Sequence, residues 1–286
     1  MVRGLPRNLA MRAPHPAQRV RYVILAIAAA VMVFPLVWLL LSAMKTTAEI
    51  QAYPFALPGR ISLQNFVEAW RVGRFADHFL SSAVVSVCSV GGLLLLGSMA
   101  GFAFARFRIW GGNLLFAVFM IALVLPVESI AFSLRDLTET LGIEDRWPAL
   151  IGPYIALEMP LAIYVFRSFF ASIPREMEEC ARLDGCNLWQ MYWRVFLPMA
   201  AQAISVVGIL VFLAVWNEFL LANFLIGPNA EQFQTLPAAF NRFYGRRTSD
   251  LNLIFAGLSI YIMPAVVVYL TFSRALTRSL AGAVKG

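Results

Sequence analysis

The sequence predicts an all-α integral membrane protein with six transmembrane helices and one polar helix–glycine–helix loop. Of the 286 residues, 60% are hydrophobic and only 14% are charged, whereas a soluble domain carries about 25% charged residues. Uncharged runs of membrane-spanning length recur along the chain, and a bilayer crossing takes about 20 apolar residues as a helix. A single compact polar segment interrupts the second half of this pattern.

Six apolar segments are expected to cross the membrane. They are 22–44, 79–105, 109–130, 149–168, 197–221 and 251–274. The fourth contains Glu158 and Pro160, yet its apolar flanks together reach the required length, and proline is tolerated where neighbouring groups satisfy the freed carbonyl. A signal peptide is disfavoured for the first, because its uncharged run is too long and no small-x-small cleavage site follows. The transmembrane domain therefore spans 22–278, between terminal tails at 1–21 and 279–286.

The basic residues orient these spans. Of the 23 lysines and arginines, 14 lie in the tails and in the loops that share their side, and 9 lie in the other three loops. The side richer in lysine and arginine is cytoplasmic in membrane proteins. Both termini and the polar loop are therefore expected in the cytoplasm. The arginines are scattered between apolar segments and build no basic face, which argues against a nucleic-acid partner.

The polar loop, 172–198, is predicted to form two short amphipathic helices joined at a glycine. Pro174 suits the first turn of a helix, Gly185 supplies a left-handed stop, and Pro198 marks the entry to the fifth span. Acidic residues follow the start, where the helix dipole favours negative charge: Glu176, Glu178 and Glu179. Apolar residues form one stripe at helical spacing: Ile173, Met177, Cys180 and Ala181. Such a module can lie in the lipid interface or dock into a groove of another protein, and its acids favour docking.

The residues of this loop resemble the EAA loop of ABC importer permeases, which reads E-A-A-x3-G-x9-I-x-L-P. Here Glu179-Cys180-Ala181 precedes Gly185, and the pattern ends at Val195-Phe196-Leu197-Pro198. Cysteine replaces the first alanine and valine the isoleucine, both small changes. The run "IPREMEECARLDG" is similar to the carbohydrate-type subfamily. The segments "AFARFR", "WNEFLLA" and "AGAVKG" agree with it, so the resemblance covers the chain from about residue 22 and is greatest to the second permease of maltose-type transporters.

The resemblance implies a type I ABC importer permease fold in the cytoplasmic membrane of a bacterium or archaeon. It also implies a coupling contact with the ATPase, formed by Glu179, Cys180, Ala181, Asp184, Gly185, Leu197 and Pro198. The expected partners are a second homologous permease, two ATP-binding subunits, an extracytoplasmic solute-binding protein and membrane lipid. The chain itself is expected to need no cofactor, because neither Lys45 nor Lys285 stands in a P-loop. ATP and Mg are then bound by the partner subunits, and this chain is not an enzyme.

The solute is expected to be a mono- or oligosaccharide, or a polyol- or glycerol-phosphate-like molecule. A carboxylate near the membrane centre costs about 2.5–3.5 kcal/mol on insertion scales, so Glu158 either serves the pathway or pairs within the bundle. The substrate-pathway candidates are Glu158, Tyr154, Tyr164, Asn217 and Glu218. The outer stretch 133–147 is expected to be an amphipathic helix that either receives the binding protein or packs across the pore mouth.

Two rival classes fit the sequence less well. An ion-coupled secondary transporter or channel needs a complete pathway in one chain, often built from inverted repeats, and no repeat relates the two halves. A membrane enzyme or metal site needs a catalytic or ligand cluster, and the spacing of the three cysteines and two histidines offers none. Within the second span, Gly97, Gly101 and Ala105 recur every four residues, a pattern that favours close packing inside the chain over a subunit interface.

Overall fold

The computed structural model describes residues 16–124 and 126–283, and within these ranges every regular element is a helix. Four helices are long and apolar enough to cross a membrane: α1 (Pro16–Ala43), α4 (Phe75–Arg106), α7 (Pro148–Ser172) and α14 (Leu251–Ala283). Two bent helix pairs bring the number of crossings to as many as six. Of the predicted tails, 1–15 and 284–286 lie outside the described residues. Helix α1 begins within the predicted N-terminal tail, and α14 continues into the predicted C-terminal tail.

Two predicted spans are divided by sharp bends. In the region of the third predicted span, 109–130, α5 (Gly112–Ala122) is followed by η1 (Val127–Ile130), and α6 (Ala131–Thr140) continues beyond the predicted end. The bend between α5 and the η1–α6 part is 100°. The fifth consists of α9 (Leu188–Met191), the π-helix η2 (Tyr192–Phe196) and α10 (Leu197–Met199), followed after a 74° bend by α11 (Ala201–Asn217). The predicted span 197–221 thus contains a bend at its start and a break after Asn217.

Pro198 explains the π-helical turn before the bend. A proline has no N–H to donate to the carbonyl one turn earlier, and its ring crowds that carbonyl. The chain forms a wider turn at this point, in which the Leu197 N–H donates to the carbonyl oxygen of Tyr192, five residues earlier. Ala200 follows with φ −79° and ψ 8°, outside the α-helical region, and α11 starts in its new direction.

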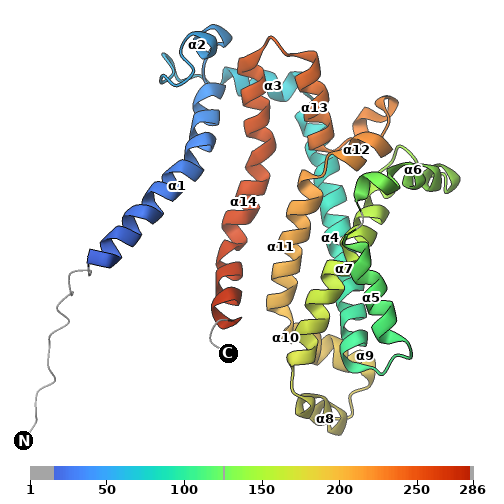
Figure 1. Cartoon of the computed structure of the whole chain (residues 1–286). Helices are drawn as coiled ribbons and strands as arrows, with labels where there is room; N and C mark the ends of the chain where they lie inside the picture. Colours follow the sequence, from blue (N-terminus) through green and yellow to red (C-terminus); the bar gives the residue numbers. More distant parts are fainter. Residues whose placement is uncertain (1–15, 125, 284–286) are drawn as a thin grey trace, which may run out of the picture.

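The remaining helices cap the two ends of the bundle (Figure 1). They are α2 (Thr47–Ala52), α3 (Gln64–Val72), α8 (Arg175–Leu183), α12 (Leu220–Leu225), η3 (Pro228–Phe233) and α13 (Leu236–Arg246). The start of α1, the end of α14 and helices α8 to α10 lie at one end, here called the α8 end. Helices α2, α3, α6 and α13 lie at the opposite end, here called the α13 end.

The packing of α4 against α7 forms the centre of the bundle. A Cβ added to Gly97 would lie 2.7 Å from the Cβ of Ala162, and one added to Gly101 would lie 2.5 Å from the Cβ of Phe166. The helices can approach this closely only because both positions are glycine. Ala105 is partly buried against the same core. The prediction that this small-residue stripe serves packing within the chain is confirmed.

Candidate functional site

The polar loop folds as the sequence predicts, with one shift in register. Pro174 is the N-cap of α8, one position before the predicted first turn. At the other end, Gly185 has φ +79°, a conformation that residues with a side chain rarely adopt. The N–H of Cys186 donates to the oxygen of Ala181 at 3.0 Å, and the N–H of Gly185 to that of Arg182 at 3.0 Å. These two bonds form a Schellman motif, which stops α8 and turns the chain toward α9.

The second half of the loop starts with its own cap. The side chain of Asn187 accepts from the N–H of Gln190 at 2.8 Å, and the Gln190 side chain accepts from the Asn187 N–H at 3.0 Å. Behind this cap, Met191, Tyr192 and Phe196 are buried. The Tyr192 hydroxyl bonds to the Ser98 hydroxyl of α4 at 2.7 Å. The loop is therefore packed onto the bundle along its length.

Arg106 joins the end of α4 to the end of α7 and brings its charge close to α8. Its side chain is 6% exposed, and its Nη2 donates to the carbonyls of Phe170 and Ile173, at 2.7 Å each. The guanidinium lies 4.7 Å from the centroid of the Phe196 ring and 3.9 Å from a carboxylate oxygen of Glu178. One cation thus connects three segments of the chain. Sequence reasoning missed this role, although a lone arginine ending an apolar run was a signal for it.

The predicted coupling residues divide between an exposed and a buried face. Glu179, Cys180, Asp184, Gly185 and Pro198 are exposed and Leu197 is half-buried, whereas Ala181 is only 5% exposed and packs into the core. The predicted apolar stripe is divided in the same way: Ile173 and Ala181 face the bundle, and Met177 and Cys180 face outward.

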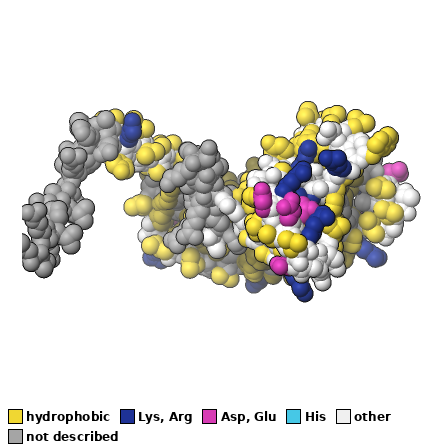
Figure 2. All heavy atoms as spheres, turned by 90° about the horizontal axis from the view of Figure 1, so that it is seen from below, with side chains coloured by type: hydrophobic (Ala, Val, Ile, Leu, Met, Phe, Trp, Pro, Cys, Tyr) yellow, Lys and Arg dark blue, Asp and Glu magenta, His cyan; other side chains and the backbone are white. Residues whose placement is uncertain are grey.

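The exposed face also presents apolar side chains that the sequence analysis did not single out. Leu183 is 87% exposed and Trp189 is 58% exposed. Figure 2 shows arginine and acidic side chains gathered on this end of the molecule, with hydrophobic side chains around them. A hollow of about 310 Å³ between the end of α4 and α8 is lined by Arg108, Glu179 and Arg182, among others. This face combines charge, apolar contact and a recess, as a protein-docking surface does.

Three substrate-pathway candidates meet in one cavity between α7 and α11. Tyr154, Glu158 and Glu218 line a volume of about 250 Å³, together with Glu128 and apolar residues. The Tyr154 hydroxyl donates to Glu218 at 2.5 Å, and Glu218 also accepts the N–H groups of Leu221 at 2.7 Å and Ala222 at 3.0 Å. Glu218 therefore fixes the start of α12, as an N-terminal carboxylate does. Glu158 has no hydrogen bond or ion pair within the described ranges, so its carboxyl group is available to the cavity.

The other two candidates lie outside this cavity. Asn217 is exposed and its side-chain oxygen accepts from the Tyr261 hydroxyl at 3.0 Å, linking α11 to α14. Tyr164 is 55% exposed on α7. Across the residues that the structure describes, no three His, Cys, Asp or Glu side chains are grouped so that they could hold a metal ion.

A bundle of membrane-length helices with a polar loop anchored at one end defines an integral membrane protein with several crossings. Residues 93–282 match the family described as binding-protein-dependent transport system inner membrane component, and the chain belongs to this family. It is 32% identical over 254 residues to the probable ABC transporter permease protein YurM of Bacillus subtilis, covering 88% of this chain and 84% of the relative. It is 30% identical over 265 residues to the diacetylchitobiose uptake system permease protein NgcG of Streptomyces coelicolor, covering 92% and 87%.

A solved structure shares the fold. The chain matches a bacterial ABC transporter involved in the import of the acidic polysaccharide alginate with a TM-score of 0.75 at 20% identity, covering 92% of this chain and 99% of that one. The protein is therefore a multi-pass permease subunit of a binding-protein-dependent ABC importer in the inner membrane, and it is not the catalytic subunit. This family membership displaces the ion-coupled transporter and the membrane enzyme as interpretations.

Proposed function

We propose that the chain imports a sugar, and that it forms half of the pathway together with a second homologous permease. Relatives named for sugar transport support the solute class: they include the diacetylchitobiose permease and a trehalose transport permease of Mycobacterium tuberculosis that is 31% identical over 255 residues. Two separate subunits bind ATP and Mg and contact the α8 end, which lies in the cytoplasm with both termini. The lysine and arginine distribution supports this orientation.

The single observation that carries the coupling proposal is the rigid attachment of an exposed α8. Glu179 and Asp184 face outward, while on the other side of the helix Ala181 packs into the core and Glu178 lies 3.9 Å from Arg106. Arg106 in turn bonds the end of α4 to the end of α7, where α8 starts. A displacement applied to α8 by a partner is then passed to α4 and α7, because the link is made of charge-assisted bonds and packed aromatic rings. Helices α4 and α7 both pack against α11, which packs against α14, so the displacement can spread through the bundle.

The cavity between α7 and α11 is proposed as a place where the sugar passes. A carboxylate accepts hydrogen bonds from sugar hydroxyls, and Glu158 and Glu128 line the cavity without a hydrogen bond or ion pair within the described ranges. Tyr154 and Glu218 are already bonded to each other, so they shape the cavity.

The coupling proposal is tested by Glu179→Lys and Gly185→Pro in the purified transporter complex. Each variant should abolish the ATPase activity stimulated by the solute-binding protein, while membrane insertion is retained. The matched control is Glu68→Lys, because Glu68 is an exposed acid on α3 at the opposite end. Normal stimulation in both test variants would disprove the docking assignment.

The sugar proposal is tested by uptake into proteoliposomes that contain the complete complex and its solute-binding protein. We expect a mono- or oligosaccharide to be accumulated when ATP is supplied. Uptake of amino acids or inorganic ions with no uptake from a sugar panel would contradict the proposal without affecting the coupling test.

A further inference from the structure

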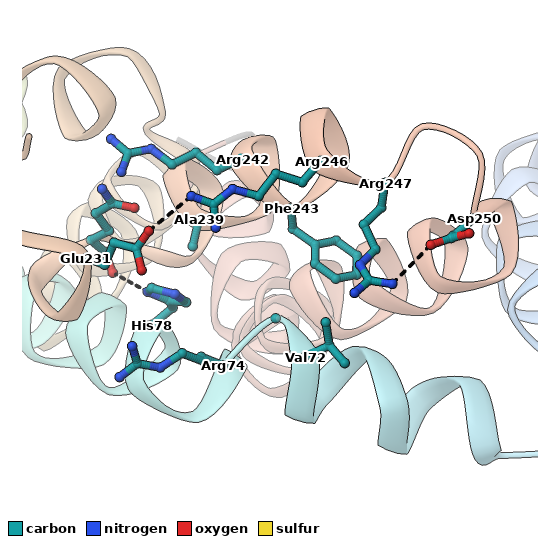
Figure 3. Close-up of a pocket in the computed structure, with 12 residues that line it drawn as sticks. Val72, Arg74, His78, Glu231, Ala239, Arg242, Phe243, Arg246, Arg247 and Asp250 are labelled. Atoms are coloured by element: carbon teal, nitrogen blue, oxygen red, sulfur yellow. Dashed lines mark hydrogen bonds and ion pairs between the residues drawn. The ribbon is translucent and has the colours of Figure 1, made fainter. Parts of the chain in front are cut away.

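A second cavity lies at the α13 end and shares no lining residue with the acidic one. It has a volume of about 300 Å³ and is lined by residues of the α3–α4 junction, η3, α13 and the start of α14. Figure 3 shows four arginines around it: Arg74, Arg242, Arg246 and Arg247. The lining acids are only two, Glu231 and Asp250. The cavity therefore carries an excess of positive charge.

Three of the arginines already have carboxylate partners. Arg247 pairs with Asp250 at 3.0 Å and Arg246 with Glu231 at 3.3 Å, and both pairs are marked in Figure 3. Arg74 pairs with Asp77, just outside the lining, at 2.7 Å. Asp250, Glu231 and Asp77 are therefore each already paired with one arginine.

Arg242 is the cation that remains. Its Nη2 makes one long hydrogen bond, 3.5 Å, to the carbonyl of Ile226. Its Nη1 is buried and has no hydrogen-bond partner, and no ion pair to Arg242 is formed within the described ranges. Burial lowers the pKa of Arg242, while the charge of Glu231 opposes that shift. A half-buried guanidinium with open donor positions costs free energy that an incoming anion would offset.

The frame around Arg242 is held in place before any ligand arrives. The Leu236 N–H, at the start of α13, donates to the Ser82 hydroxyl of α4 at 2.7 Å. The ring of His78, also on α4, contacts the carbonyl of Gln234 at 3.3 Å. The Ser81 hydroxyl donates to the carbonyl of Gln232 at 2.8 Å. These bonds fix the base of α13, so Arg242 is presented from a rigid element, as a recognition residue should be.

We infer that this cavity receives a carboxylate side chain of the solute-binding protein, with Arg242 as its main partner. A planar guanidinium with free donors matches the two oxygens of a carboxylate. The cavity lies at the end opposite α8, which the proposed function places outside the cell, and the inference rests on that function. A protein side chain is favoured over the transported solute because this cavity shares no lining residue with the cavity of Tyr154, Glu158 and Glu218.

The test uses the complete complex in nanodiscs and its purified, solute-loaded binding protein. The measurement is ATPase rate against binding-protein concentration at two salt concentrations. Arg242→Gln should raise the half-saturating concentration about tenfold, retain the rate at saturation and weaken the salt dependence. Arg242→Lys keeps the charge but lacks the planar guanidinium with its several donors. Its half-saturating concentration should therefore lie between those of the wild type and Arg242→Gln. The matched control is Arg71→Gln, because Arg71 is exposed on α3 beside the cavity and does not line it.

A charge exchange identifies the partner residue. The Arg242→Glu variant should be stimulated again by one acid-to-arginine variant of the binding protein and by no other. The inference is overturned if Arg242→Gln and Arg242→Lys both saturate at the wild-type concentration. It is also overturned if free glucuronate competes with the wild-type interaction where acetate at the same concentration does not, because the cavity then recognises an acidic sugar. If the wild-type complex shows no stimulation by the binding protein, the proposed function fails instead.

Discussion

Replacing Arg106 by leucine tests whether α8 is held to the bundle as a rigid lever. The substitution removes the two hydrogen bonds to the carbonyls of Phe170 and Ile173, both 2.7 Å long. It also removes the cation that lies 4.7 Å from the Phe196 ring and 3.9 Å from Glu178, although Glu178 keeps its 2.7 Å ion pair with Arg182. Leucine fills part of the same volume, so the loss is mainly one of bonds.

The structure sets the size of the effect. A hydrogen bond to a charged group contributes about 1.5–3 kcal/mol, and two such bonds are lost. Burying the guanidinium costs desolvation energy, and its Nε has no hydrogen-bond partner to offset that cost. The substitution removes this cost, so the net loss of stability is smaller than the sum of the two bonds. We therefore expect a net loss near the lower bound, about 3 kcal/mol, which weakens the attachment of α4 to the end of α7, where α8 starts, about a hundredfold.

Hydrogen exchange of the α8 amides measures this attachment directly. In Arg106→Leu these amides should exchange about a hundredfold faster than in the wild type, and stimulated ATPase activity should fall. Arg71→Leu is the matched control, because Arg71 is an exposed arginine on α3 at the opposite end of the bundle. Unchanged α8 exchange together with normal coupling in Arg106→Leu would refute the lever interpretation.

Two further substitutions test the packing and the acidic cavity. Gly101→Ala should lower the unfolding free energy by about 1–3 kcal/mol, because its Cβ would lie 2.5 Å from the Phe166 Cβ; thermal unfolding in detergent measures it. Gly91→Ala, whose Cβ would meet nothing within 4 Å, is the control, and equal melting temperatures for both variants would contradict the packing account. Tyr154→Phe removes the 2.5 Å bond to Glu218 and should cost about 1.5–3 kcal/mol by the same measurement. A wild-type melting temperature for this variant would show that the bond does not stabilise the cavity.

The sequence by itself determined the features that local chemistry encodes. Apolar length predicted six membrane crossings, since a bilayer admits few other spanning structures. The structure has four helices of spanning length, or up to six if each bent pair is one crossing. A glycine after an amphipathic run predicted the stop of α8, and the left-handed conformation of Gly185 confirms it. Four-residue spacing predicted the close approach of helices at Gly97 and Gly101, because small residues at that interval share one face.

Tertiary structure decided which distant groups meet. Arg106 reaches carbonyls 64 and 67 positions away, and the π-helical turn before Pro198 sends the chain into a 74° bend that apolar periodicity does not contain. The same is true of Arg242, which has no ion pair among the described residues because the neighbouring arginines are paired with the nearby acids. Hydrophobic patterning reports which face of a helix is buried, but the pairing of individual polar groups depends on how helices far apart in the chain are packed.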